Sequence, residues 1–287
     1  MMSCENAVGC LTVDVEDWFH ILDDPAVPAF ADWAGLVARL PQNMELLLSL
    51  FDEHKVKVTM FWLGWAAEKY PALVRRCADE GHEIASHGYG HVLAYEVGCT
   101  LFREDIRRGK KVIEDITGMP VIGFRAAGFG TRPDTPWIFE EIRDADYLYD
   151  SSVFPAKRGH GGIADFRIEP HKINTTKGDI LEIPQSVVDV FGKRVSFFGG
   201  GYLRIAPVFL IKWGISKLQK TNLPLVVYVH PREVDPKHPR LPLTLNRRFK
   251  SYVNLKSTIP KLHWLCENYK FQLMKDFLVK TSEGEKE

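Results

Sequence analysis

Short apolar stretches of strand length alternate along the chain with longer stretches in which apolar residues recur at helical spacing. Residues 9–15 and 56–63 are largely apolar, and the second stretch is rich in β-branched and aromatic side chains, so both predict buried strands. Residues 43–54 repeat leucine and phenylalanine at helical spacing and predict a helix. The pattern also predicts helices over 65–80 with a break at Pro71, 102–117, 136–144, 206–215 and 259–269, and strands over 83–85, 121–125, 181–183, 225–230 and 270–274.

Strands that alternate with helices indicate βα units and a mainly parallel sheet. Polar side chains stand at or just after the ends of the predicted strands: Asp14 and Glu16, His87, Arg125, and His230. Because α/β barrels place their active sites at the carboxyl ends of the strands, we expect these side chains to converge. We expect one domain, with a barrel over residues 9–275 and a polar tail over 276–287.

Composition excludes some classes of function. The chain has 287 residues with 37 basic and 37 acidic side chains, so a generally basic surface for nucleic acid is not supported. Arg247, Arg248 and Lys250 form a small basic patch, which we interpret as solvated surface. The 5 cysteines are widely spaced and form no CxxC pair, which is untypical of a disulfide framework or a cysteine zinc site and favours a reducing compartment.

The first residues show no basic segment followed by an apolar run, as a signal peptide would have. The longest apolar stretches are of strand or packed-helix length, well short of the roughly 18–20 residues that cross a bilayer. We therefore expect a cytoplasmic protein without a transmembrane segment. The sequence does not predict the oligomeric state.

His87 and His91 have the spacing H-x3-H. Residues at i and i+4 share a face of a helix, so this spacing can direct two imidazoles at one metal ion. Gly88 and Gly90 lie between them and favour a loop or a frayed helix start over a regular helix. Two ordinary polar loop histidines remain the alternative at this point.

Three carboxylates, Asp14, Glu16 and Asp17, crowd the end of the first predicted strand. Alternation along a strand places Asp14 and Glu16 on one face, with Asp17 at the turn. Two imidazoles and one carboxylate form a common open zinc site, and the second carboxylate could act as a general base. The alternative is a surface acidic turn that caps the next helix.

His230 ends an apolar strand and is followed by Pro231, which suits an acid held in a fixed position; a core histidine with one backbone bond is the alternative. Arg125 has a similar setting, and we expect it to pair with a carboxylate, for function or only for structure. The remaining histidines have no such setting, and we interpret them as ordinary structural residues: His20, His54, His82, His160, His171, His238 and His263.

In this order, the motifs resemble the polysaccharide deacetylase family, also called the NodB-homology or carbohydrate esterase 4 family. The similar segments are residues 12–17 (TVDVED), 87–91 (HGYGH), 125–128 (RAAG) and 228–230 (YVH). The D-V-E-D-W start, residues 149–152 and 199–202, and the H-P-x-E of residues 230–233 resemble a subgroup found in bacterial exopolysaccharide and surface-glycan gene clusters. The resemblance covers about residues 9–275.

The resemblance implies a distorted (β/α)7 barrel and a division of labour among the site residues. Glu16, His87 and His91 would hold a divalent metal, and Asp14 would be the base that activates the attacking water. His230 would protonate the leaving amine, and backbone N–H groups near Gly128 would stabilise the oxyanion. Two further residues would have orienting roles: Arg125 toward Asp14, and Asp150 toward His230.

The chain departs from the family pattern at three positions. Val15 separates two carboxylates that are usually adjacent, so we take Glu16 as the ligand and Asp17 as the reserve. Gly88 replaces a serine or threonine whose hydroxyl often supports the loop, and Ala127 replaces a proline. None of these changes removes a metal ligand, but they leave open a different acyl pocket or reduced activity.

The sequence thus predicts a metal-dependent N-deacetylase that acts on an N-acetylated amino sugar in a surface glycan or in its nucleotide-linked or lipid-linked precursor. A lipid-linked substrate would bring the protein into peripheral contact with a membrane. Zinc suits the ligands best, and cobalt, nickel and manganese are compatible. The alternatives are a non-catalytic glycan-binding or assembly protein on the same barrel, and a hydrolase of a non-sugar amide.

Overall fold

The structure, a computed structural model, describes residues 8–159 and 161–283. Its centre is an eight-stranded sheet in the order β10-β1-β2-β3-β4-β5-β7-β6. All neighbours from β10 to β7 are parallel, and β6 alone runs antiparallel to β7. The strands are β1 (Gly9–Val15), β2 (Thr59–Trp62), β3 (Glu83–Ser86), β4 (Gly123–Phe124), β5 (Tyr149–Asp150), β6 (His171–Thr175), β7 (Gly178–Glu182) and β10 (Leu225–Val229).

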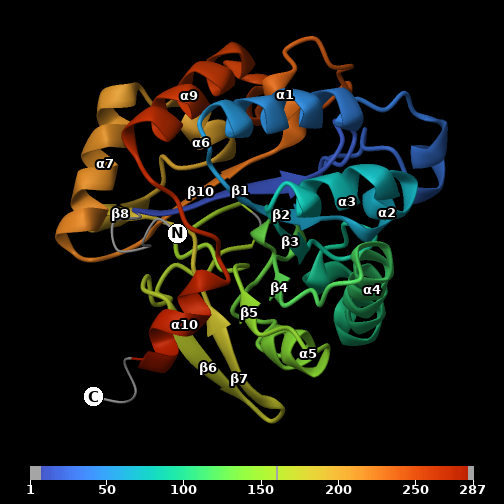
Figure 1. Cartoon of the computed structure of the whole chain (residues 1–287), viewed down its shortest axis with the longest axis horizontal. Helices are drawn as coiled ribbons and strands as arrows, with labels where there is room; N and C mark the ends of the chain where they lie inside the picture. Colours follow the sequence, from blue (N-terminus) through green and yellow to red (C-terminus); the bar gives the residue numbers. More distant parts are fainter. Residues whose placement is uncertain (1–7, 160, 284–287) are drawn as a thin grey trace.

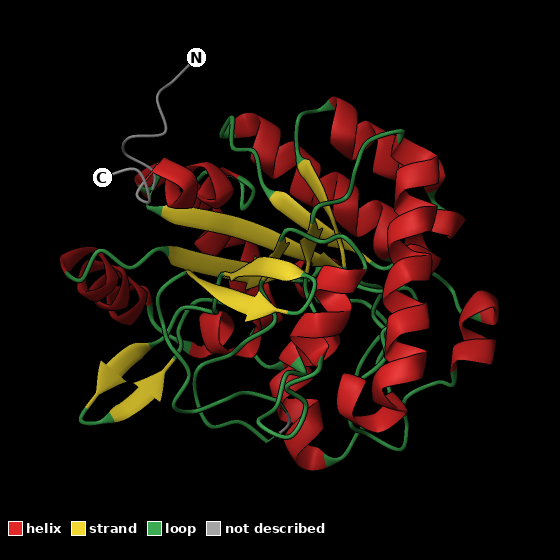
Figure 2. Ribbon diagram, turned by 90° about the horizontal axis from the view of Figure 1, so that it is seen from below, coloured by secondary structure: helices red, strands yellow, loops and turns green. Residues whose placement is uncertain are grey.

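This sheet curls into a half-barrel with helices outside it (Figures 1 and 2). The predicted fold class is confirmed: it is a single α/β domain with a distorted barrel of parallel strands. The segment that follows β7 is joined to β10 through the side chain of Ser186. Ser186 Oγ accepts the Val226 N–H at 2.7 Å and donates to the Pro224 carbonyl at 3.0 Å.

The helices follow the predicted order, with some shifted ends. The expected break at Pro71 separates α2 (Gly64–Lys69) from α3 (Pro71–Asp79). The helix expected from residue 102 begins earlier, as α4 (Ala94–Thr117), and Gly98 inside it has a non-helical φ of 76°. The other helices that correspond to predicted segments are α1 (Leu40–Glu53), α5 (Ile138–Asp144), α7 (Val208–Lys220) and α9 (Thr258–Asn268).

Several elements were not predicted, and β7 overlaps the strand expected over 181–183. The unpredicted elements are α6 (Gly200–Ile205), α8 (Leu245–Tyr252), the 3-10 turns η2 (Phe30–Gly35), η3 (Ala127–Phe129), η4 (Pro231–Val234) and η5 (Leu255–Ser257), the strands β5 and β6, and the hairpin of β8 (Val188–Val190) with β9 (Lys193–Val195). Residues 270–274, expected as a final strand, form one isolated parallel bridge between Phe271 and Gly9.

The segment expected as a polar tail from residue 276 begins with a helix, α10 (Asp276–Glu283). Phe277 of α10 is buried against Met274 in an apolar cluster that fills the inside of the half-barrel. Packing therefore continues past the boundary expected at residue 275, and residues 284–287 lie outside the described part.

Strand β1 is buried along its whole length, so alternation decides which side chains reach the site. Leu11 and Val13 belong to the main core cluster, whereas Cys10 belongs to the inner cluster. Asp14 therefore lies on the inner face, on the same side as Cys10, and this places a carboxylate at the carboxyl end of the half-barrel.

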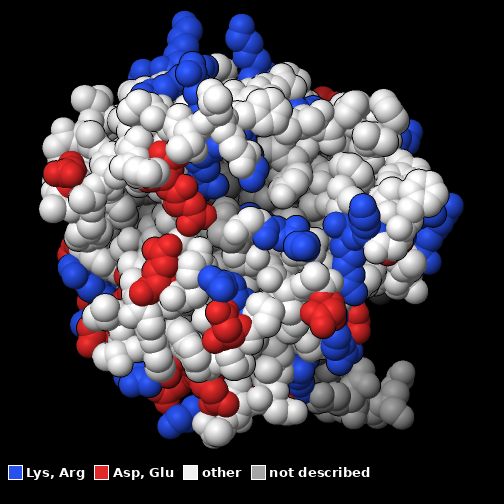
Figure 3. Space-filling view, turned by 180° about the vertical axis from the view of Figure 1, so that it is seen from behind, with Lys and Arg blue, Asp and Glu red and all other residues white. Residues whose placement is uncertain are grey.

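Among residues 8–159 and 161–283, no helix is both long enough and apolar enough to cross a membrane. Basic and acidic side chains share the surface. On the face seen in Figure 3, basic side chains gather along the upper edge and around a central hollow, while acidic side chains lie mostly to its left and below it.

Candidate active site

Glu16, His87 and His91 converge at the carboxyl end of the sheet, as predicted. All three are buried, and their ligand atoms lie within 4.8 Å of one another. Glu16 Oε1 is 3.2 Å from His87 Nε2 and 2.9 Å from His91 Nε2. Burial raises the pKa of Glu16, but His91, His230 and His87 outweigh it and hold this pKa well below its ordinary value.

The donor set fits a divalent metal ion. His87 Nδ1 lies 2.7 Å from the Arg125 carbonyl oxygen, which can only accept, so the ring proton belongs on Nδ1. In the neutral ring Nε2 is then a bare acceptor that faces the carboxylate of Glu16. A metal ion or a proton between these two acceptors relieves their repulsion, and a carbonyl behind the ligand nitrogen is the usual way to fix a metal-binding histidine.

The loop that carries both histidines is supported by Asp105 of α4. Its carboxylate accepts the N–H groups of Tyr89 at 2.9 Å and Gly90 at 2.7 Å. Gly88 has a φ of +76°, and a Cβ there would lie 2.4 Å from Asp105 Oδ2. The missing hydroxyl at position 88 is thus compensated by Asp105, whose approach requires glycine.

Asp14 lies beside the metal ligands and is paired with Arg125, as expected. Arg125 Nη1 donates to Asp14 Oδ1 at 2.7 Å and to Thr12 Oγ1 at 2.8 Å. The same guanidinium bonds the carbonyl and hydroxyl of Ser151, at 3.2 and 3.1 Å. With Arg125 fully buried, this network fixes one oxygen of Asp14 and leaves Oδ2 directed toward His230, whose Nε2 is 3.9 Å away.

His230 is held by Glu233, which the sequence interpretation missed. His230 Nδ1 is 3.2 Å from Glu233 Oε2, and Glu233 Oε1 is 2.9 Å from Nε of the buried Arg204. Burial lowers the pKa of His230, but the charges of Glu16 and Glu233 outweigh it and raise this pKa above its ordinary value. Although burial opposes it, Arg204 and His230 lower the pKa of Glu233 to about 2.

We expected Asp150 to orient His230, but the structure gives each of them other partners. Both ring nitrogens of His230 are accounted for by Glu233 on one side and by Asp14 and Glu16 on the other. Asp150 instead bonds the Ser152 hydroxyl and shares a buried site with Glu182. The signal for Glu233 was its place three residues after His230, within the H-P-x-E segment.

Asp17, the reserve ligand, caps a helix. Its carboxylate accepts the N–H groups of Arg39 at 3.0 Å and Leu40 at 3.2 Å at the start of α1, and that of Trp18 at 2.8 Å. The helix-capping alternative therefore describes Asp17, while Glu16 faces the histidines. Glu16, and not Asp17, is therefore the candidate third ligand.

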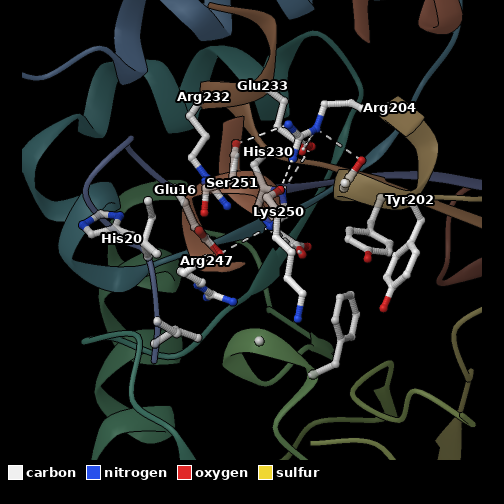
Figure 4. Close-up of a pocket in the computed structure, with 18 of the residues that line it drawn as sticks. Glu16, His20, Tyr202, Arg204, His230, Arg232, Glu233, Arg247, Lys250 and Ser251 are labelled. Atoms are coloured by element: carbon white, nitrogen blue, oxygen red, sulfur yellow. Dashed lines mark hydrogen bonds and ion pairs between the residues drawn. The ribbon is translucent and has the colours of Figure 1, made fainter. Parts of the chain in front are cut away.

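Asp14, Glu16, His91, His230 and Glu233 line one pocket of about 350 Å³, shown in Figure 4. His20, interpreted from sequence as structural, also lines it. Its Nδ1 accepts the Asp17 N–H at 3.0 Å, and in the described part of the chain its Nε2 has no hydrogen-bond partner. Burial, together with the charge of His91, lowers the pKa of His20 well below its ordinary value. Gly128, with a φ of 62°, lies at the pocket wall near the position expected for oxyanion donors.

A second group that could hold a metal, Glu53, His54 and His263, is more exposed. His54 Nε2 and His263 Nδ1 lie 2.7 Å apart, so one imidazole can satisfy the other without an ion. The buried group is therefore the candidate metal centre.

Two family models match most of the chain. Residues 29–143 match "Polysaccharide deacetylase", and residues 151–279 match "Domain of unknown function (DUF3473)". The pocket draws on both stretches and on β1, which precedes them. Asp14 lies in β1 and Glu16 directly follows it, His91 comes from the first match, and Arg204, His230 and Glu233 come from the second. The buried residues His87 and Arg125 also belong to the first match.

Two curated relatives of the chain are named as deacetylases. A peptidoglycan-N-acetylglucosamine deacetylase of Bacillus cereus is 32% identical over 145 residues, which are 49% of this chain and 65% of the relative. A chitooligosaccharide deacetylase of Rhizobium leguminosarum bv. trifolii is 44% identical over 45 residues, or 16% of this chain and 21% of the relative. The chain thus spans less than two thirds of the length of these relatives.

Solved structures share the fold at low sequence identity. A Mycobacterium smegmatis protein assigned to the polysaccharide deacetylases has a TM-score of 0.60 and 18% identity, over 99% of this chain and 94% of that one. Puue allantoinase has a TM-score of 0.57 and 14% identity, over 93% and 87%. The fold thus also occurs in an allantoinase. In sequence, residues 29–143 are similar to the polysaccharide deacetylase family.

Proposed function

We propose that the protein is a metal-dependent N-deacetylase that hydrolyses the acetamide of an N-acetylated amino sugar. One arrangement carries the proposal: a base and an acid, Asp14 and His230, flank a buried metal-ligand set in a single pocket. The family and the names of the curated relatives support the same chemistry. Zinc is the metal that two imidazoles and one carboxylate suit best, with cobalt, nickel or manganese as compatible ions.

Each step is assigned to a side chain of this chain. A bound divalent ion would supply Lewis acidity, polarising the acetamide carbonyl and the attacking water. Asp14, held through Oδ1 by Arg125, takes a proton from that water through its second oxygen. The water oxygen bonds to the carbonyl carbon, the C–N bond breaks, and His230 Nε2 gives its proton to the departing amine. Acetate and a free amino sugar are the products.

Other residues of the pocket would position the acid and contact the substrate. Glu233 accepts from His230 Nδ1 and leaves Nε2 to face the substrate. The backbone N–H of Gly128 would stabilise the oxyanion, and the exposed rings of Tyr202 and Phe249 at the pocket can stack against a sugar face.

We also propose that the chain belongs to the subgroup associated with bacterial surface-glycan gene clusters. The support is that two residues by which the chain resembles this subgroup have structural roles at the pocket. Glu233 of H-P-x-E holds His230, and a Cβ at Gly199 would lie 2.1 Å from the ring of Tyr228, so glycine is required beside the pocket. The substrate in this proposal is a surface glycan or its nucleotide-linked or lipid-linked precursor.

The test is acetate release by the metal-loaded protein from a panel of N-acetylated sugars and small amides, with Asp14→Asn as the comparison. We expect release from at least one sugar and a loss of on the order of 100-fold or more in Asp14→Asn. Release from small amides alone would favour a non-sugar amidase. No release from any compound, with the metal bound, would favour a glycan-binding protein and overturn the proposal.

A further inference from the structure

Four basic side chains, which we call the basic wall, line the pocket. Arg158, Arg232, Arg247 and Lys250 all line it, and they come from three separate segments: the loop after β5, η4, and α8. Arg247 and Lys250 are three residues apart on α8 and so share one side of that helix. Figure 4 shows Arg232, Arg247 and Lys250 in the same pocket as Glu16 and His230.

The carboxylates that line the pocket are already used. Asp14 is paired with Arg125, Glu233 with Arg204 and His230, and Glu16 with the metal-site histidines, all at 3.2 Å or less. Within residues 8–159 and 161–283, none of the four wall cations has a carboxylate oxygen within 4.0 Å. Asp23 and Glu96 line an adjoining pocket on the far side of Arg247 and Lys250.

Two of these cations have donors that lack partners in the described chain. Nε and Nη1 of Arg232 and Nε of Arg247 are buried atoms without a hydrogen bond. Burial and the charges of Arg232 and Arg158 lower the pKa of Arg247, and the charges of Asp23 and Glu16 offset this only in part. Unpaired, partly desolvated like charges are costly, which is the arrangement expected where an anion completes the site.

Hydrogen bonds fix the backbone at the end of α8 and the side chain of Arg158. Arg204 donates to the Val253, Lys250 and Ser251 carbonyls at 2.6, 2.8 and 3.2 Å, so the carboxyl end of α8 is fixed to α6. Arg158 donates to the Gly128 carbonyl at 3.1 Å and lies over the ring of Phe154. A fixed backbone at Lys250 and a fixed Arg158 lower the entropy cost of gathering these donors around an anion.

We infer that the substrate of this site is an acidic sugar, with a phosphate or carboxylate group close to the acetamide that occupies the basic wall. This inference rests on the proposed deacetylase function and narrows its substrate. Phosphate and carboxylate share the chemistry the wall recognises, since both accept paired N–H bonds from guanidinium groups. The phosphate would come from a sugar linked to a nucleotide or lipid carrier, and the carboxylate from a uronic acid next to the amino sugar.

The test compares three N-acetylated substrates with the metal-loaded full chain: neutral chitotetraose, a uridine-diphosphate-linked N-acetylglucosamine, and a hyaluronan tetrasaccharide. We expect kcat/KM for one of the acidic substrates to exceed that for chitotetraose about tenfold or more, and this preference to fall as salt is added. The double variant R247Q/K250Q should lose the preference. Arg248→Gln is the matched control, because Arg248 is exposed on the same helix and lines neither pocket.

Two outcomes would overturn the inference alone: chitotetraose as the best substrate, or an unchanged preference in R247Q/K250Q. Absence of acetate from every substrate would instead count against the deacetylase function. In that case, calorimetric titration with inorganic diphosphate and with glucuronate would still test whether the basic wall binds anions. We expect R247Q/K250Q to bind at least one of them about tenfold more weakly than Arg248→Gln, and equal affinity would contradict the inference.

Discussion

His230 Nδ1 lies 3.2 Å from Glu233 Oε2, and through this contact Glu233, together with Glu16, raises the pKa of the proposed acid. The charge of Glu233 is one of the causes that raise the pKa of His230 above its ordinary value, against the effect of burial. An acid must be protonated to act, so activity should fall as pH rises through the pKa of His230.

Glu233→Gln removes that charge, so the pKa of His230 should fall and the alkaline limb of the kcat profile should move to lower pH. The measurement is kcat against pH for acetate release. Glu104→Gln, at an exposed position, is the control and should keep the wild-type profile. A Glu233→Gln profile that overlays the wild type would contradict the role of Glu233. Circular dichroism checks that the loss of the Arg204 ion pair has not unfolded the protein.

Asp150 and Glu182 form a buried pair of carboxyls that should make stability depend on pH. Burial raises the pKa of Asp150 to about 6, and burial and the charge of Asp150 raise that of Glu182 well above its ordinary value. The folded protein therefore holds protons that the unfolded chain has released above about pH 4–4.5. The stability contributed by this pair is present at low pH and is lost as pH rises through the folded pKa values.

Glu182→Gln should therefore stabilise the protein at pH 7.5 by about 1 kcal/mol or more and have little effect near pH 4. Urea unfolding at the two pH values measures the difference. Glu267→Gln is the exposed control and should change stability at neither pH. An equal effect of Glu182→Gln at both pH values would show that these carboxyls do not retain protons in the folded state.

The metal-site loop should tolerate substitution poorly at Gly88. Gly88→Ala and Gly98→Ala both place a Cβ on a residue with φ of +76°, but only the first meets an obstacle, Asp105 Oδ2 at 2.4 Å. Gly98→Ala should cost about 1–3 kcal/mol from backbone strain, because φ 76° with ψ 172° is a conformation that only glycine adopts readily. Gly88→Ala should cost about 1–3 kcal/mol more, because a bond from Asp105 to the loop is lost.

Zinc titration separates the two glycine variants further. Gly88→Ala should weaken zinc affinity about 10-fold or more, as loss of a support behind metal ligands does, while Gly98→Ala should bind as the wild type. Matching zinc affinities would mean that Asp105 does not position His87 and His91.

Metal removal should lower thermal stability through the same site. A ligand that binds only the folded state at 100 times its Kd stabilises it by about 2.7 kcal/mol, so chelation should lower Tm by several degrees. Differential scanning fluorimetry with zinc and with chelator measures this. His91→Ala should abolish the zinc-dependent shift, and His171→Ala, on β6 away from the site, should retain it. A zinc shift that survives in His91→Ala would place the ion elsewhere.

Local sequence patterns were sufficient for much of the fold. The alternation of strands and helices predicts the parallel half-barrel because each βα unit buries its own apolar face. The ligands Glu16, His87 and His91 were found because they follow strands that share one edge of the sheet. The cytoplasmic location stays a prediction.

The residues that were missed act across long separations in sequence. Asp105 reaches the histidine loop from α4, and Arg204 joins α6 to both Glu233 and α8. Arg247 and Lys250 were interpreted as solvated surface, because nothing near them in sequence shows that α8 folds over the pocket. Asp150 was assigned to His230 by resemblance, yet the neighbouring strand supplies Glu182 as its partner.

The most direct test of the account is a crystal of the zinc-loaded protein measured at the zinc absorption edge. The account predicts an anomalous peak within bonding distance, about 2.0–2.2 Å, of Glu16 and of the Nε2 atoms of His87 and His91, with Asp14 and His230 on either side of the open position. A zinc-loaded crystal with no peak there, or with zinc bound by Asp17 in place of Glu16, would contradict it.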